Sequence, residues 1–215
     1  MQDINRFITG FRHFQKDFFG SESSEFEPLK KGQSPKTMLI GCSDSRVDPA
    51  IMTQCAPGDI FMVRNVANLV PPFEEDEGRH GVSAALEFAA CHLEVDHIVV
   101  LGHSQCGGIH ALMDGICASK PKSFIANWMS IAVPARDQIL TNLPDKSPEI
   151  QRRAAEQAAI LLSIENLHTF PFIEQRIKAG TLALHGWYFD LDQGELLEYC
   201  ANQGVFKKLT ERVDS

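Results

Sequence analysis

The chain has 215 residues, with 20 Lys and Arg against 28 Asp and Glu, so its formal net charge is −8. Its length and its 44% hydrophobic and 22% charged content predict one globular domain spanning residues 1–215. The acidic balance argues against sequence-independent nucleic-acid binding and anionic-membrane binding, which need a basic surface, and six cysteines are too few for a disulfide scaffold.

The first predicted element is an amphipathic helix that ends near Gly20 and the serines of 21–24. It forms an arm, residues 1–35, ahead of an α/β core, residues 36–215. So many aromatic residues on one stripe need a partner surface, which is either the chain's own domain or a neighbouring subunit. The stripe consists of Ile4, Phe7, Ile8, Phe11, Phe14, Phe18 and Phe19.

Beyond the arm, short apolar runs alternate with helical patterns, which predicts a mainly parallel central sheet with an antiparallel edge, flanked by helices. No stretch resembles a membrane span or a secretory signal, so we expect a cytoplasmic protein with free thiols. The predicted strands are 37–40, 59–66, 97–101, 181–190 and 195–200. The predicted helices are 47–53, 81–93, 108–113, 124–140, 148–168 and 205–212.

Two polar motifs, GCSDSR and GHSQCGG, follow predicted strands, and sites in such sheets lie at the carboxyl ends of strands. They contribute Cys42, His103 and Cys106. Two thiolates and one imidazole suit a tetrahedral zinc ion, and three protein ligands leave the fourth position open for catalysis. Cys106 also begins a predicted helix, where the helix dipole favours a thiolate.

Asp44 and Arg46 follow Cys42 by two and four residues. A carboxylate beside a metal can orient a bound water, and an arginine can keep that carboxylate ionised. Taken alone, the same two residues are more typical of an ordinary ion pair in a surface turn, because such pairs are common.

Together, the motifs Cys42-Ser-Asp-Ser-Arg46 and His103-Ser-Gln-Cys106-Gly-Gly resemble the two signature motifs of the β-class carbonic anhydrases. The sequences RNVAN at 64–68 and HGW at 185–187 are also similar to that family, and the likeness covers nearly the whole chain. The resemblance implies zinc-dependent, reversible hydration of carbon dioxide to bicarbonate and a proton, through a hydroxide on the zinc.

The resemblance also implies a role for each matching residue. Cys42, His103 and Cys106 match the zinc ligands, and Asp44 and Arg46 match the catalytic pair. The family forms dimers, often assembled into tetramers or octamers, whose pockets take walls from the partner subunit, and the aromatic arm would clasp that partner. The positions that match substrate-binding residues are Gln33, Phe61, Val66, Phe88 and Gly107.

The chain departs from one subgroup of this family. Bicarbonate-regulated members have a Trp and a Tyr where this chain has Leu39 and Phe189. Gln33 is similar to the glutamine of the plant-like subgroup, although Phe88 stands where plant members have Tyr. We therefore expect no regulatory bicarbonate pocket, and we expect Asp44 to pair with Arg46 rather than to bind zinc.

Three alternative functions remain open from the sequence. The same scaffold also carries hydrolases of carbon disulfide or carbonyl sulfide. A non-enzymatic zinc or interaction protein is disfavoured because all five residues of the signature are intact. Thiol redox chemistry is disfavoured because the spacing is His-x-x-Cys and not Cys-x-x-Cys.

Overall fold

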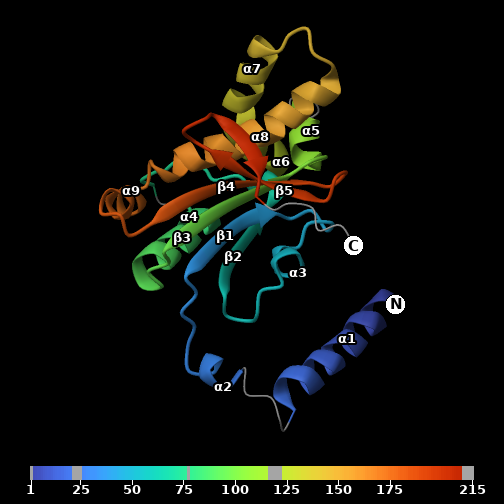
Figure 1. The fold of residues 1–215 in the computed structure, drawn as a ribbon, viewed down its shortest axis with the longest axis vertical. Helices are drawn as coiled ribbons and strands as arrows, with labels where there is room; N and C mark the ends of the chain where they lie inside the picture. Colours follow the sequence, from blue (N-terminus) through green and yellow to red (C-terminus); the bar gives the residue numbers. More distant parts are fainter. Residues whose placement is uncertain (1, 21–25, 77, 116–122, 210–215) are drawn as a thin grey trace.

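The computed structural model describes residues 2–20, 26–76, 78–115 and 123–209. Its centre is a six-stranded sheet in the order β2-β1-β3-β4-β5-β6 (Figure 1). Strands β2, β1, β3 and β4 run parallel, and β5 and β6 continue the sheet antiparallel. This confirms the predicted mixed sheet. The strands are β1 (Thr37–Cys42), β2 (Ile60–Asn65), β3 (His97–His103), β4 (Ala183–Asp190), β5 (Glu195–Cys200) and β6 (Val205–Lys208).

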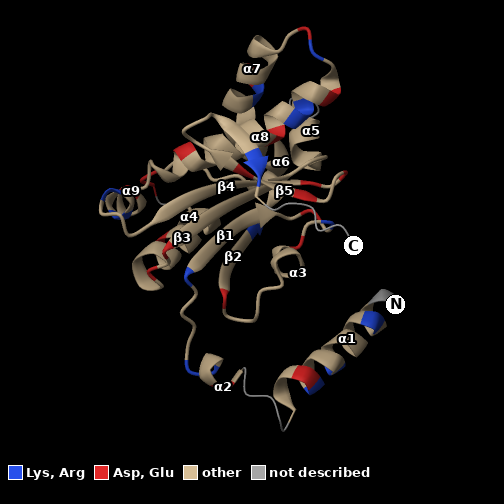
Figure 2. Ribbon diagram, in the orientation of Figure 1, with Lys and Arg blue, Asp and Glu red and all other residues tan. Residues whose placement is uncertain are grey.

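The two central strands owe their place to their composition. β1 and β3 contain no Lys, Arg, Asp or Glu, and Figure 2 shows the charged residues mostly on helices, loops and strand ends. From Met38 to Cys42 every residue of β1 is buried, as is β3 from Ile98 to His103. Continuous apolar runs of this kind are typical of parallel strands that are covered on both faces.

One face of the sheet is covered by α4 (Gly81–Glu87), α8 (Pro148–Leu167) and α9 (Pro171–Lys178), which share a core with the central strands. The opposite face packs on the short α3 (Pro49–Thr53). Helices therefore flank the sheet as expected, although α9 was not predicted. The main core contains Ile40, Leu86, Ile98, Val100, Ile160, Phe170, Ile173 and Tyr188.

A separate helical layer packs at the carboxyl ends of the strands. It contains α5 (Gly107–Met113), α6 (Phe124–Met129) and α7 (Val133–Asn142), and it shares a core with part of α8. We predicted one helix over 124–140, but the structure breaks it at the 3-10 turn η4 (Ser130–Ala132). Pro134 lies in the first turn of α7. Proline has no backbone N–H and cannot donate to the carbonyl one turn earlier, so one continuous helix would lose a hydrogen bond here.

The prediction of a helix over 205–212 is wrong where the structure describes it. Residues Val205–Lys208 form β6, which pairs with β5 after a turn at Gly204, and Phe206 packs against Tyr188 and Tyr199. Pairing at a sheet edge has overridden a short amphipathic pattern. Residues 210–212 lie outside the described part of the chain.

Helix α1 (Gln2–Phe19) confirms the predicted amphipathic helix and projects away from the sheet (Figure 1). Phe14 contacts Phe18 and Phe19 of the same helix and Phe26 of α2 (Phe26–Leu29). The rest of the stripe, Ile4, Phe7, Ile8 and Phe11, is 47–61% exposed. A single chain therefore leaves most of this apolar stripe uncovered. The serines of 21–24, where we expected the helix to end, lie outside the described residues.

No described helix has the length and apolarity needed to span a bilayer.

Candidate metal centre

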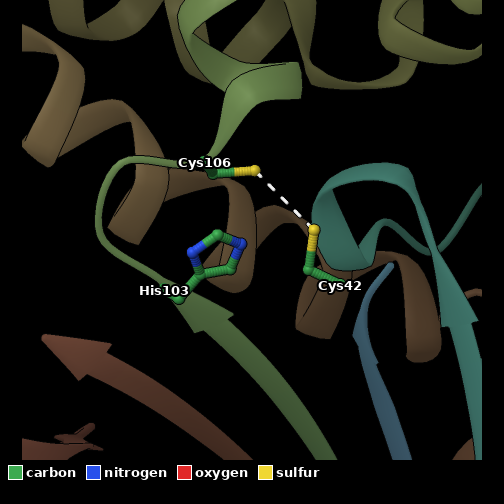
Figure 3. Close-up of side chains that lie close together, drawn as sticks. All are labelled: Cys42, His103 and Cys106. Atoms are coloured by element: carbon green, nitrogen blue, oxygen red, sulfur yellow. Dashed lines mark hydrogen bonds between the residues drawn. The ribbon is translucent and has the colours of Figure 1, made fainter. Parts of the chain in front are cut away.

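Two sulfur atoms and one imidazole meet at the carboxyl end of the sheet (Figure 3). Cys42 is the last residue of β1 and His103 is the last residue of β3. These strands are parallel neighbours, so their final side chains lie close together. Cys106 joins them with its Sγ 4.0 Å from the Sγ of Cys42, and all three residues are buried.

The turn between His103 and Cys106 brings these two ligands to one point. Gln105 adopts a left-handed backbone conformation with φ 59°, which is uncommon for a residue with a side chain. Cys106 then becomes the N-cap of α5, and its sulfur points toward that of Cys42 (Figure 3). Uncommon backbone conformations of this kind concentrate at functional sites.

The hydrogen bonding of His103 leaves one ring nitrogen available. Its Nδ1 lies 2.8 Å from the carbonyl oxygen of Ser104, so Nδ1–H donates and Nε2 keeps its lone pair. The buried Nε2 has no hydrogen-bond partner among the residues that the structure describes. A metal-binding histidine has this arrangement, in which the second nitrogen fixes the tautomer.

The spacing of the sulfurs fits zinc. Two Zn–S bonds of about 2.3 Å at a tetrahedral angle place the sulfurs about 3.8 Å apart, close to the separation in the structure. Together, the donor set, the sulfur spacing and the partnerless imidazole nitrogen match a zinc ion bound by Cys42, His103 and Cys106.

The two thiols of the cluster are linked by a hydrogen bond. This hydrogen bond lowers the pKa of Cys42, against the effect of burial. The same hydrogen bond and burial raise the pKa of Cys106. A divalent cation that binds both sulfurs must displace any thiol proton, which couples metal affinity to pH.

Asp44 and Arg46 form a bidentate pair beside this cluster. The Asp44 oxygens accept hydrogen bonds from Arg46 Nε at 3.0 Å and Nη2 at 2.7 Å. The guanidinium holds the pKa of Asp44 well below its usual range. Asp44 Oδ2 is also 3.9 Å from the partnerless Nε2 of His103. The expected pairing of Asp44 with Arg46 is present, and it places an ionised carboxylate next to the ligand atoms.

Arg46 also ties the two motifs together through Gln105. Its Nη1 and Nη2 donate to the side-chain and backbone oxygens of Gln105, and the Gln105 amide donates to Asp192. Sequence reasoning missed Gln105. The available signal was its place between His103 and Cys106, because a residue between two ligands must lie near the site.

Arg64 and Asn65 organise the loops around Cys42. Arg64 donates to the backbone oxygens of Cys42, Asp44 and Val47. Asn65 closes the following turn through two hydrogen bonds with the backbone of Leu69. Both side chains hydrogen-bond to backbone atoms and so fix the conformation of these loops.

The predicted pocket residues divide between the two ends of the sheet. Val66 follows Asn65, the register partner of Cys42, and Gly107 follows Cys106, so both lie at the metal end. Phe61 pairs instead with Met38, about 13 Å from Cys42 at about 3.3 Å per residue.

Phe88 stacks near Phe61, with 5.7 Å between ring centroids. Gln33 precedes the amino end of β1 and is exposed. Within one chain, then, Gln33, Phe61 and Phe88 lie far from the cluster that they were expected to serve.

A family model described as carbonic anhydrase matches residues 37–196, well over half of the chain. This chain belongs to the carbonic anhydrase family. A carbonic anhydrase of Synechocystis sp. is 36% identical over 196 residues, which are 91% of this chain and 71% of that protein. The solved structure of the β-carbonic anhydrase CcaA has a TM-score of 0.91 and 34% identity, and the match covers 100% of this chain and 95% of that one.

One of two tetrameric β-carbonic anhydrases from Sordaria macrospora has a TM-score of 0.74 and 28% identity, with 96% of each chain covered. The protein is thus a β-class carbonic anhydrase, an enzyme that interconverts carbon dioxide and bicarbonate. Its buried Cys42–His103–Cys106 cluster is consistent with the zinc of that class.

We predict about one zinc per chain in the purified protein, and loss of that zinc in Cys106→Ser, because a hydroxyl replaces one of three ligands. Elemental analysis after dialysis against a weak chelator measures this. Cys91→Ser is the control, since Cys91 is exposed and outside the cluster. Equal zinc contents in Cys106→Ser and the control would contradict the ligand assignment.

Proposed function

We propose that Cys42, His103 and Cys106 hold one zinc ion and that Asp44 and Arg46 set the geometry of attack on carbon dioxide. The observation that carries this proposal is the partnerless Nε2 of His103, which lies beside two sulfurs and 3.9 Å from Asp44 Oδ2. When bound, zinc lowers the pKa of a water molecule so that it becomes a nucleophile near neutral pH.

Asp44 acts as the hydrogen-bond acceptor that orients the attacking water. Its carboxylate can accept that hydrogen bond only while ionised, and Arg46 keeps its pKa well below the usual range. The folded-state pKa is depressed, so the stabilising effect of the pair is fully present above the unfolded pKa of about 4 and is lost as pH falls further. Asp44 is therefore ionised, and able to accept this hydrogen bond, near neutral pH.

We predict that Asp44→Asn lowers kcat/KM for carbon dioxide hydration by about 10–100-fold, the usual cost of removing a partner just outside a metal's ligands. Zinc content stays unchanged because Asp44 is not a ligand. Stopped-flow hydration with an indicator measures the rate, and Asp145→Asn, an exposed carboxylate in a distant turn, is the matched control. Full activity of zinc-loaded Asp44→Asn would refute the role of Asp44.

We propose that the carbon dioxide pocket is completed by a second copy of the chain. Val66 and Gly107 belong to the metal end of their own chain, whereas Gln33, Phe61 and Phe88 lie at the other end of the sheet. In the pocket, Phe61 and Val66 supply apolar walls that exclude water, and the amide of Gln33 donates to an oxygen of bicarbonate. Phe88 adds an apolar surface but no hydroxyl for proton transfer.

The N-terminal arm, residues 1–35, is proposed to hold that second copy against the core, residues 36–215. A groove of about 950 Å³ beside β2 and α6 is lined in part by Val66, Ile125 and Trp128. Phe124 at its edge is 99% exposed. A groove with a mainly apolar lining and an uncovered apolar helix on one molecule fit the two sides of a contact between copies. Dimers, or tetramers like those described for the Sordaria proteins, would follow.

We predict that Phe11→Glu shifts the protein toward the monomer and lowers hydration activity along with it. A charge in the middle of the apolar stripe must be desolvated when the helix packs on a partner. Light scattering coupled to gel filtration gives the mass. Thr9→Glu introduces the same charge on the opposite side of α1 and should keep the assembly; an equal effect of both changes would argue against the stripe as the contact.

We also propose that the enzyme belongs to the plant-like subgroup without bicarbonate regulation. Leu39 is fully packed among Val99 and Leu101, and Phe189 lies against the same apolar cluster, so neither offers a polar group to an anion. We predict carbon dioxide hydration without cooperative inhibition by added bicarbonate at pH 7.5–8.5, a range chosen for the test. Sigmoidal inhibition curves in steady-state assays would exclude this subgroup.

The cytoplasm is the proposed location, because thiolate ligands persist in a reducing compartment. Cys42, Cys55, Cys91, Cys106 and Cys200 are all free. Cell fractionation with a specific antibody checks this proposal.

A further inference from the structure

A buried carboxylate lies behind the loop that carries Cys106. Glu156 belongs to α8 and is only 4% exposed, with Ala155 and Ala159 of the same helix buried near it. Burying a charged side chain is costly unless hydrogen bonds and fixed dipoles stabilise it. The proposed reaction gives Glu156 no role, so its burial needs another explanation.

Glu156 receives three polar groups from two other elements. Its Oε1 accepts the backbone N–H of Cys106 at 3.1 Å and faces His110 Nε2 at 2.9 Å. Its Oε2 accepts the hydroxyl of Tyr188 at 2.8 Å. His110 also donates its backbone N–H to the carbonyl of Cys106. A single carboxylate oxygen therefore holds both ends of the first turn of α5, and that turn begins at a ligand.

The surroundings keep Glu156 in place. Tyr188 is fully buried in β4, and the guanidinium of Arg153 lies 5.4 Å from the centre of its ring. Arg153 pairs in turn with Asp190 at 2.7 Å. This network joins α5, α8 and β4 next to the ligand Cys106. Satisfied buried networks of this kind are rigid, because any displacement leaves a buried polar group unpaired.

We propose that Glu156 is a positioning residue that fixes the sulfur of Cys106 and slows the loss of zinc. Its hydrogen bond anchors the Cys106 backbone, and its negative charge lies close to a ligand of a divalent cation, which favours binding of that cation. The inference rests on the proposed function, since it assumes that Cys106 binds the metal.

The test measures zinc release from loaded protein into an excess of a chromophoric chelator. Glu156→Ala removes the acceptor and the charge, so we expect release to be about 10–100-fold faster. Glu156→Gln keeps an oxygen for the Cys106 N–H but loses the charge, so a smaller acceleration is expected. Glu165→Gln makes the same change at an exposed position of α8 and should release zinc at the wild-type rate.

A second readout separates positioning from general destabilisation. Cobalt substitution gives thiolate-to-metal absorption bands, which should shift in the Glu156 variants while far-UV circular dichroism stays unchanged. If Glu156→Ala does not fold, Glu156→Gln and His110→Ala carry the test, because His110→Ala removes the other group bound to the same oxygen. Wild-type zinc release and unshifted bands in the folded variants would overturn the inference. Zinc retention by Cys106→Ser would instead overturn the proposed metal site.

Discussion

The parallel pairing of β1 with β3 is the constraint on which the whole site depends. Their register sets Gly41 opposite Leu101, so both strands end at the same edge and deliver Cys42 and His103 to one point. A shift of one residue would turn one of these side chains to the other face of the sheet. Register is secure here because both strands are buried over most of their length. The packing that stabilises the apolar centre of the sheet thus also sets the geometry of the metal site.

The polar side chains around the ligands hydrogen-bond to one another and to the ligand loops. Arg46 binds Asp44 and the Gln105 turn at once, Arg64 holds the loop after Cys42, and Glu156 holds the turn after Cys106. Each ligand loop is therefore fixed by a charged side chain from another part of the chain. These contacts hold the ligand atoms close together, which reduces the ordering that metal binding must supply.

The sequence predicted the sheet, most helices and the ligand set because these depend on local periodicity and on motifs that end strands. It failed where the outcome depends on distant partners. Val205–Lys208 became a strand only because β5 offers an edge. Glu156 falls within the predicted helix 148–168, and a carboxylate on the inward face of that helix was a usable signal. Nothing in a linear pattern, however, shows that Tyr188 and the Cys106 backbone supply its hydrogen bonds.

The separation of Gln33 and Phe61 from the metal end of their own chain has a genetic consequence. If each pocket is built from two copies, a chain that has lost Cys106 still carries intact pocket walls, and a chain that has lost Gln33 still carries an intact metal site. A dimer of one chain of each kind would then contain one complete site and one doubly damaged site. Two individually inactive alleles would complement each other in one cell.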